Sequence, residues 1–454
     1  MYKIEPMELT KKSKELLDLF SKNKCIKQNI SSDHTLDNIL LQIYDDIHSA
    51  YSFRFGEIEK ETTNKRTSKF LPKISVSEIN HVGEIPYPTK FPISSFPEEI
   101  RQHINMTSKH RIDYTIKNYH RKEKEVSFHF ILGDIPSTNP NKYISYAKHM
   151  LAWLDIVDEY AYKNCADKLD VYLYFTELQK GMPSSNMYVL GENNVNTAFT
   201  TTCPKTSEIV IFRAEEWFKV FMHETFHNFA LDFSDMNTDV CHNKIRKIFD
   251  VESDVNLYEA YTETWAEIFN ICFFSYHSLK HDLKNDAIYF PNYKDYVKKQ
   301  KLFLKIVKSS LNIERGYSIF QMIKVLGFMG LSYETLISPK EDNQILRNTL
   351  YKEDSNILAY FVIKAIIMSN YKDFLIWCNT NNTSLLQFKS TQKNQLLFCD
   401  FIKKHYKQSS FLSQVSCFEE YTSELLEKHR KAKKKHTINS FLLNNLRMTI
   451  YELE

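Results

Sequence analysis

Five consecutive residues, His223-Glu224-Thr225-Phe226-His227, carry the clearest chemical signal in this chain of 454 residues. On an α-helix, residues four positions apart lie on the same face, so both imidazoles can reach a single metal ion. In this H-E-x-x-H arrangement the histidines bind zinc, and the glutamate is a general base toward a water molecule that the metal activates. The pattern therefore predicts that His223 and His227 hold one Zn²⁺ ion and that Glu224 is the catalytic base.

The residues around this motif indicate a buried helix. Residues 214–233 contain no Pro or Gly, and Glu215 and Glu216 lie in the first turn, where the helix dipole favours carboxylates. Most other positions are large and apolar, which is typical of a helix enclosed on all sides. Two histidines and a glutamate in such a core are costly unless something satisfies them. Zinc binding is favoured, and a pair of hydrogen-bonded core histidines is the alternative.

A third protein ligand is expected downstream of the helix. Four nearby candidates could reach the metal only through a sharp turn: Asp232, Asp235, Asp239 and His242. Residues 256–276 predict a second helix, on which Glu259, Glu263 and Glu267 share one face because they are spaced four residues apart. No Lys or Arg in this segment can pair with them. The acidic face therefore favours a metal ligand, with a solvated acidic stripe as the alternative.

The second helix carries a further motif, Glu263-Thr264-Trp265-Ala266-Glu267. H-E-x-x-H followed by E-x-x-A-E on another helix resembles the gluzincin branch of zinc peptidases. In that group the first acid of the second motif is the third zinc ligand, and the second acid orients a ligand histidine. The resemblance implies that Glu263 completes the zinc site, and that Glu267 and Glu259 support it from outside the ligand set.

The residue that stabilises the oxyanion differs from the pattern of the resemblance. The spacing between His227 and Glu263 is closer to that of lethal-factor-like peptidases, which place a tyrosine seven residues before the ligand glutamate. This chain has Asn256 at that position. Tyr258 and Tyr261 are the nearby candidates for the catalytic hydroxyl, and packing in the core is the alternative role for each.

The metzincin pattern, a different arrangement of zinc ligands, is excluded. It requires Gly at position 230 and His at position 233, and this chain has Ala230 and Phe233 there.

The residues before the first helix predict a supporting sheet. We expect a charged-tip hairpin, a helix and three more strands: residues 112–119 with 126–132, then 141–162, 168–175, 195–202 and 208–213. This order resembles a zincin-like catalytic domain of the α+β class, with a small mixed sheet and an active-site helix. In that resemblance residues 195–202 form the sheet edge that pairs with an extended substrate. An ordinary internal strand is the alternative.

Three regions follow from these patterns. Residues 1–105 predict a helical N-terminal arm with a Pro-containing linker, residues 106–285 the zincin-like domain, and residues 286–454 a mostly α-helical C-terminal region. The linker, residues 61–100, could cross the catalytic cleft, although a plain connector is favoured.

Charge and apolar patterning limit the partners. The chain has 59 Lys and Arg against 56 Asp and Glu, so no global field steers it to nucleic acid or membrane. One basic run, residues 428–436, could bind nucleic acid, but a solvated helix end is favoured. Residues 317–331 and 357–368 are interrupted by polar residues or too short to span a bilayer, and they predict buried helices. With no signal peptide in the N-terminal residues, these features predict a cytoplasmic or intracellular protein.

The eight cysteines are scattered and show no C-x-x-C spacing. Such usage in an intracellular protein predicts reduced thiols in the core rather than a disulfide framework.

Together these features predict a zinc-dependent metallopeptidase that acts on a protein or peptide substrate. A zincin-shaped, non-catalytic structural or interaction protein, such as a virion component, is the alternative, and a zinc hydrolase with a non-peptide substrate is a third. Residues 196–232 and the Asn-, Lys- and Ile-rich, Gly-poor composition also resemble uncharacterised zincin-like proteins of large DNA viruses. That resemblance implies a viral protein located in the virion or the host cytoplasm.

Overall fold

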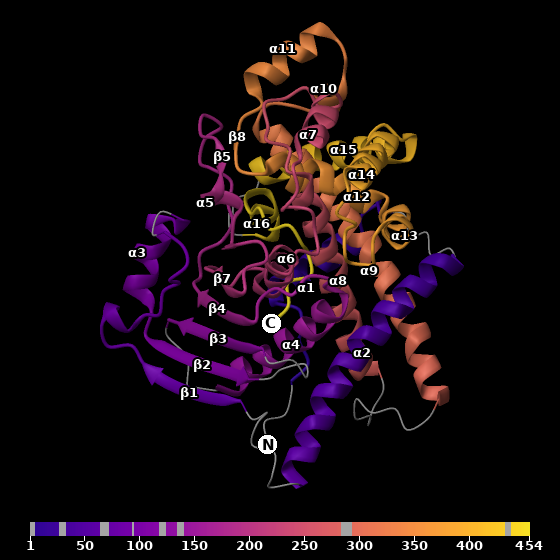
Figure 1. The fold of residues 1–454 in the computed structure, drawn as a ribbon. Helices are drawn as coiled ribbons and strands as arrows, with labels where there is room; N and C mark the ends of the chain where they lie inside the picture. The colour runs from indigo at the N-terminus through magenta and orange to yellow at the C-terminus, as the bar shows by residue number, and fades with distance from the viewer. Residues whose placement is uncertain are drawn as a thin grey trace.

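The protein combines a six-stranded mixed sheet with a larger body of helices, as the computed structural model shows (Figure 1). The structure describes these parts of the chain: residues 5–26, 33–63, 72–92, 95–117, 124–133, 140–282, 293–431 and 437–454. The arrangement confirms the predicted α+β class.

The sheet has the strand order β1-β2-β3-β4-β7-β6. Its strands are β1 (Lys73–Glu78), β2 (His110–Lys117), β3 (Glu125–Leu132), β4 (Lys168–Phe175), β7 (Thr206–Ile211) and β6 (Ala198–Thr200). β1, β2 and β3 pair antiparallel, β3, β4 and β7 pair parallel, and β6 runs antiparallel to β7 at the edge. The expected hairpin is confirmed as β2 and β3, and residues 195–202 contribute the edge strand.

Alternation along β4 divides the sheet into two apolar faces. Leu169, Val171 and Leu173 belong to the main core, whereas Tyr172 and Tyr174 belong to a smaller core on the other face. The main face is covered by α4 (Pro140–Tyr160) and α6 (Trp217–Asn228).

The outer face is covered by residues from the segment that was expected to be a linker. This segment contains η2 (Val82–Glu84) and the first turn of α3 (Glu98–Thr107), and its Phe96 packs against Tyr174 with ring centroids 5.5 Å apart. The backbone amides of Thr89 and Lys90 donate to the Glu208 carboxylate at 2.9 and 2.7 Å. The segment also supplies β1, which the sequence did not predict. Its described part therefore packs on the face of the sheet opposite α6.

The remaining elements are helices and one short strand pair. The N-terminal helices are α1 (Lys11–Ser21) and α2 (His34–Thr63). The middle of the chain contains β5 (Leu190–Gly191), α5 (Glu192–Val195), α7 (Asp239–Arg246) and α8 (Leu257–Asp282). The C-terminal part contains α9 (Tyr293–Phe328), α10 (Tyr333–Ile337), α11 (Glu341–Leu350), β8 (Glu353–Asp354), the π-helix η5 (Leu358–Ile363), α12 (Lys364–Ser369), α13 (Tyr371–Asn381), α14 (Gln392–His405), α15 (Ser409–Lys431) and α16 (Ile438–Asn444).

One hydrophobic core connects these elements and includes residues from Met7 to Leu453. α2 packs against α4, α8, α9 and α13, and its long diagonal is visible in Figure 1. The two ends of the described chain also meet, because Leu9 forms an antiparallel bridge with Leu453. Both apolar stretches considered above as possible spans lie in buried helices, and no helix in the described ranges has the length and apolarity needed to cross a membrane.

Two disulfides correct the prediction that the cysteines are reduced. Cys25 is bonded to Cys417 and Cys165 to Cys203, while the other four cysteines are free and buried. The prediction failed because the partners are 392 and 38 residues apart in the sequence, so no local spacing marks them as pairs.

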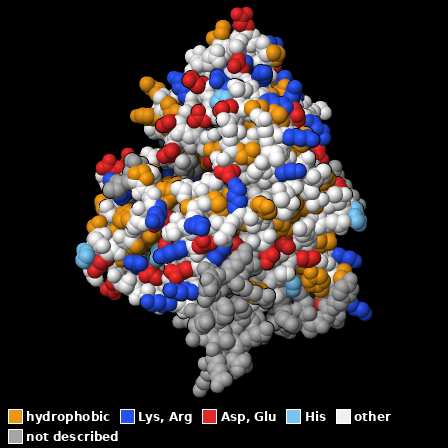
Figure 2. Space-filling model, in the orientation of Figure 1, with side chains coloured by type: hydrophobic (Ala, Val, Ile, Leu, Met, Phe, Trp, Pro, Cys, Tyr) orange, Lys and Arg blue, Asp and Glu red, His pale blue; other side chains and the backbone are white. Residues whose placement is uncertain are grey.

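Charges of both signs are interspersed on the face of the molecule shown in Figure 2. Of the basic run at residues 428–436, the part up to Lys431 forms the end of α15, where Lys431 pairs with Glu427 at 2.6 Å. The rest of the run lies outside the described residues.

Candidate metal centre

The helix α6 holds His223 and His227 on one face, deep in the protein. Every residue of α6 is buried, and the two histidines are only 6 and 9% exposed. The neighbouring helix α4 contacts α6 through Trp153, whose indole N–H donates to the Thr225 hydroxyl at 2.7 Å. The two imidazoles therefore occupy a fixed place between the sheet and the helical body.

The Nε2 atoms of both histidines converge on the carboxylate of Glu259 from α8. The distances are 3.1 Å between the two Nε2 atoms, 3.1 Å from His223 Nε2 to Glu259 Oε2 and 3.4 Å from His227 Nε2 to the same oxygen. A tetrahedral zinc site with bonds of 2.0–2.1 Å requires ligand atoms about 3.3 Å apart. These three atoms are the one group in the described chain whose spacing suits a metal ion, and their spacing and chemistry fit zinc.

Glu263, the third ligand expected from the sequence, is not a member of this cluster. Its Oε2 lies 2.9 Å from Nδ1 of His223, the ring nitrogen that faces away from Glu259. Its Oε1 lies 2.5 Å from Nζ of Lys219. A carboxylate in this position fixes the orientation of the imidazole and leaves Nε2 free to bind a metal.

The chain reverses directly after α6 in a Schellman motif. Ala230 adopts the left-handed conformation with φ 50°, its N–H donates to the His227 carbonyl at 2.9 Å, and the Leu231 N–H donates to the Phe226 carbonyl at 2.8 Å. This turn satisfies carbonyls at the end of the helix and sends the chain back toward the His227 ring.

The reversal brings Asp232 to His227. Asp232 Oδ2 contacts Nδ1 of His227 and accepts a hydrogen bond from Thr262 of α8 at 3.1 Å. Its Oδ1 accepts from the Ser234 backbone and hydroxyl. Each histidine of the motif is thus oriented by a carboxylate at Nδ1.

Glu224 lines a small cavity next to the cluster. The cavity has a volume of about 30 Å³, which is enough for one water molecule. Its wall includes His223, Glu263, Tyr360 and Ala198 of the edge strand β6. Glu224 and His223 therefore line the same cavity, which has room for one water molecule.

Tyr360 belongs to the site, although no pattern in the sequence selects it. Its hydroxyl donates to Glu259 Oε2 at 3.0 Å, and its ring centroid lies 6.0 Å from that of His223. It lies on η5, and π-helical turns are frequent at functional sites because they redirect individual side chains. Tyr360 therefore supplies a hydroxyl at the edge of the cluster.

Burial and neighbouring charges shift the pKa values of these groups. Burial raises the pKa of Glu224, which favours its proton-accepting role near neutral pH. Burial opposes ionisation of Glu259, but the charges and hydrogen bonds of His227 and His223 hold its pKa well below the usual range. Burial also opposes protonation of His227, yet the charges of Asp232 and Glu259 raise its pKa well above the usual range. In the metal-free protein the cluster is therefore held together by ion pairs.

The other residues predicted for the site lie at different distances from it. Tyr258 is partly exposed, with its ring centroid 6.0 Å from that of His227. Tyr261 is buried and donates to the Leu386 carbonyl at 2.8 Å, and Glu267 pairs with Lys364 at 2.7 Å. Asn256 donates to the side chain of Asn356 at 2.9 Å. Tyr261 and Glu267 thus make contacts outside the cluster.

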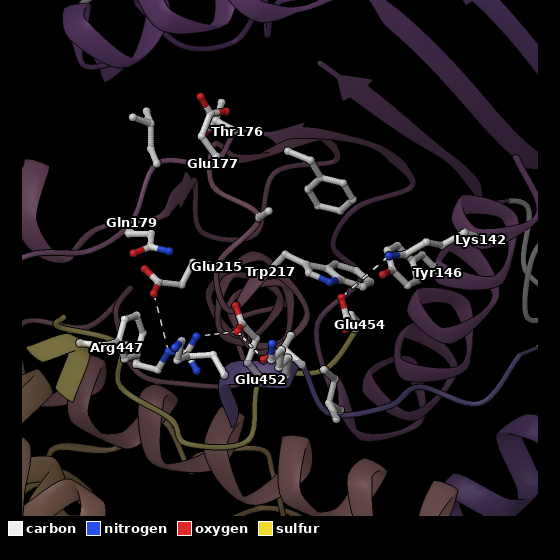
Figure 3. Close-up of a pocket in the computed structure, with 18 of the residues that line it drawn as sticks. Lys142, Tyr146, Thr176, Glu177, Gln179, Glu215, Trp217, Arg447, Glu452 and Glu454 are labelled. Carbon is white, nitrogen blue, oxygen red and sulfur yellow. Dashed lines mark hydrogen bonds and ion pairs between the residues drawn. The ribbon is translucent and has the colours of Figure 1, made fainter. Parts of the chain in front are cut away.

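A larger cavity, of about 690 Å³, lies at the opposite end of α6, around Trp217 (Figure 3). Its charged residues pair with one another: Arg447 lies 3.6 Å from Glu215 and 2.5 Å from Glu452. The candidate chemistry is therefore located in the smaller cavity and not in the larger one.

Comparisons with known proteins do not assign this chain to a family. No protein-family model matches it, and no curated protein or solved structure is significantly similar to it.

Proposed function

We propose that this protein is a zinc-dependent peptidase in which His223, His227 and Glu259 hold the metal. The observation that carries the proposal is the convergence of two Nε2 atoms and one carboxylate oxygen at 3.1–3.4 Å. A zinc ion bound there supplies Lewis acidity and lowers the pKa of water toward neutrality. With three protein ligands, one coordination position is left for water or substrate, as in catalytic zinc sites.

Glu224 is the proton carrier in this proposal. Its carboxylate takes a proton from the attacking water and delivers it to the nitrogen of the leaving amine, so that no covalent bond to the protein forms. Glu263 and Asp232 keep the two imidazoles in the tautomer that has the proton on Nδ1.

Tyr360 is the candidate for stabilising negative charge on the carbonyl oxygen of the substrate. Its hydroxyl already contacts Glu259 at the edge of the cluster, and burial raises its pKa well above the usual range, so it stays a hydrogen-bond donor. We prefer Tyr360 to Tyr258 and Tyr261 in this proposed role because its hydroxyl contacts a proposed ligand. The hydroxyl of Tyr261 instead donates to the Leu386 carbonyl.

The test combines metal analysis with cleavage of a peptide library. We expect wild-type protein to bind one zinc ion per chain and to cleave peptides. Glu224→Gln should retain the metal and lose at least about 10²-fold in cleavage rate, because only the base is removed. Glu259→Gln should weaken metal binding strongly.

A matched control is Glu267→Gln, which alters a carboxylate on the same helix that contacts Lys364 outside the cluster. It should retain zinc stoichiometry. Wild-type protein without zinc, or Glu259→Gln with unchanged affinity, would contradict the proposed ligand set.

A second candidate function is a zinc-containing scaffold with no catalytic activity. The observation that favours it is the narrow cavity, with Glu224 only 7% exposed. Protein that binds zinc stoichiometrically but cleaves no member of the library would support the scaffold over the peptidase.

A further inference from the structure

Lys219 is a buried cation on α6, one turn before His223. It is 2% exposed and lies on the same face of the helix as His223, since the two are four residues apart. A buried lysine is costly unless its charge is paired. Its position next to the cluster, on a helix that is otherwise mostly apolar, therefore requires an explanation.

The ammonium group of Lys219 is connected to the metal cluster through a single carboxylate. Nζ lies 2.5 Å from Oε1 of Glu263, and the other oxygen of that carboxylate lies 2.9 Å from Nδ1 of His223. Both oxygens of Glu263 are thus engaged, one by the lysine and one by the histidine. Rotation of the carboxylate would break both contacts.

A carboxylate buried this deeply needs a charge nearby, and Lys219 supplies one to Glu263 through the contact at 2.5 Å. A charged acceptor binds the N–H of an imidazole more strongly than a neutral one does. The two contacts of Glu263 thus connect Lys219 to His223 through one carboxylate.

A second carboxylate, that of Glu216, also lies near the ammonium group of Lys219. Glu216 Oε1 lies 3.9 Å from Nζ of Lys219, and the other oxygen of Glu216 accepts from Lys180 at 2.8 Å. Glu216 has the left-handed φ of 60°, a strained conformation for a residue with a side chain. Its Oε1 also accepts the backbone N–H groups of Met448 and Thr449 at 2.8 and 2.7 Å. These bonds hold Glu216 in the strained conformation and give the lysine a fixed counter-charge.

We propose that Lys219 is a positioning residue for the metal centre: through Glu263 it fixes the His223 imidazole so that Nε2 faces the metal. This inference rests on the proposed function. The ammonium group of Lys219 contacts the carboxylates of Glu263 and Glu216, so its removal should change how tightly the metal is held while leaving the three ligands in place.

The experiment measures zinc affinity by competition with a chelator, and the visible absorption spectrum of Co²⁺-loaded protein, in the full chain. Lys219→Met should weaken zinc binding by about 10-fold and alter the cobalt spectrum, as loss of a partner that orients a ligand does. Glu263→Gln should have a comparable effect. The double variant, Lys219→Met with Glu263→Gln, should bind zinc as tightly as the single variant that has the lower zinc affinity. The two losses do not add because both substitutions act on the same contact with His223.

The double variant also separates an effect on the metal site from a folding defect. It removes both buried charges at once, so neither is left without its partner. Lys324→Met is the matched control: Lys324 is a similarly buried lysine whose ammonium group donates to the carbonyls of Leu442 and Asn445. It should lower the unfolding midpoint and leave zinc affinity unchanged.

Two results would overturn the inference and can be told apart from failure of the proposed function. Lys219→Met with wild-type zinc affinity and a lowered unfolding midpoint would make the lysine purely structural. Loss in the double variant equal to the product of both single losses would mean that the two residues act separately. Wild-type protein that binds no zinc would instead contradict the proposed function, and the inference with it.

Discussion

The two histidines of the candidate metal centre are held by carboxylates from different parts of the chain. Glu263 comes from α8, 40 residues after His223, whereas Asp232 follows His227 by five residues. The sequence identified Asp232 only as a possible ligand, because its route to the helix required a sharp turn. The structure contains that turn and brings Asp232 to Nδ1, the side of the ring away from the cluster.

The main difference between the expected and the observed site is which glutamate of α8 reaches the two histidines. Glu259, Glu263 and Glu267 are equivalent in the sequence, since all three share one face of a helix. Their roles depend on where α8 passes α6, which brings Glu259 to both Nε2 atoms and Glu267 to Lys364. In the proposed metal site each role therefore lies one helical turn earlier than the resemblance implied.

Replacement of Tyr360 by Phe tests the proposed hydroxyl. We expect a loss of about 10²-fold in the rate of peptide cleavage, because one donor to the developing oxyanion is removed. Zinc affinity should fall less than in Glu259→Gln, since a hydrogen bond to a proposed ligand is lost but no ligand atom is removed. The same substitution at Tyr261, whose hydroxyl donates to the Leu386 carbonyl, is the control and should lower stability more than activity. Equal activity of Tyr360→Phe and wild type would remove Tyr360 from the mechanism.

The ion pair of His227 gives the metal-free protein a specific pH dependence. Burial alone would lower the pKa of His227, but Asp232 and Glu259 raise it well above its usual value. A histidine whose pKa is higher in the folded than in the unfolded protein stabilises the fold when it is protonated. This contribution is fully present below the pKa of the unfolded state, about 6.5, and is lost as the pH rises through the pKa of the folded state.

After treatment with a chelator, wild type should have a higher free energy of unfolding than His227→Gln at about pH 6. This difference should be smaller at about pH 9. Chemical denaturation at both pH values measures the difference. A difference that stays constant between them would show that His227 does not carry this charge in the folded protein.

At the scale of secondary structure, α6 is shorter than expected and has a residue with positive φ beyond each end. It was expected to extend over residues 214–233, and it covers Trp217–Asn228. Glu216 and Ala230, both with positive φ, flank the shorter helix. Neither residue is a glycine, so the sequence contained no ordinary signal for a left-handed residue at either position.

The turn at Ala230 should be sensitive to the shape of the side chain. Ala230→Val is expected to destabilise the protein by about 1–3 kcal/mol, because a β-branched residue is strained at positive φ. It should also weaken zinc binding, since Asp232 follows the turn. Ala230→Gly is the control that accepts this conformation and should preserve zinc affinity. Thermal unfolding and chelator competition provide the two measurements, and equal behaviour of Val and Gly would exclude a role for the turn.

At the scale of the whole molecule, the disulfide between Cys25 and Cys417 joins distant parts of the chain. One cysteine follows α1 and the other lies on α15, 392 residues later. We expect replacement of both cysteines by Ser to lower the free energy of unfolding by about 2–4 kcal/mol, because a long loop is no longer closed in the unfolded chain. Denaturation of the variant and of wild type without reductant measures the change. Zinc affinity should stay the same, and an unchanged unfolding midpoint would contradict the expected contribution.

The local features of this protein could be predicted from neighbouring residues alone. Alternating and helical apolar patterns are read over a few neighbouring residues, and they predicted the hairpin, β4, α4 and the buried helix that carries His223, Glu224 and His227. Spacing of four residues on one helix was sufficient to place both histidines on one face.

Tertiary structure decided the contacts that depend on how distant elements cross. These are the choice of Glu259 among three equivalent glutamates, the approach of Tyr360 from a π-helix, the burial of Lys219 against Glu263, and the pairing of four cysteines. Each joins residues separated by 36 to 392 positions, and their distance in space is set by packing of the whole core rather than by any local pattern.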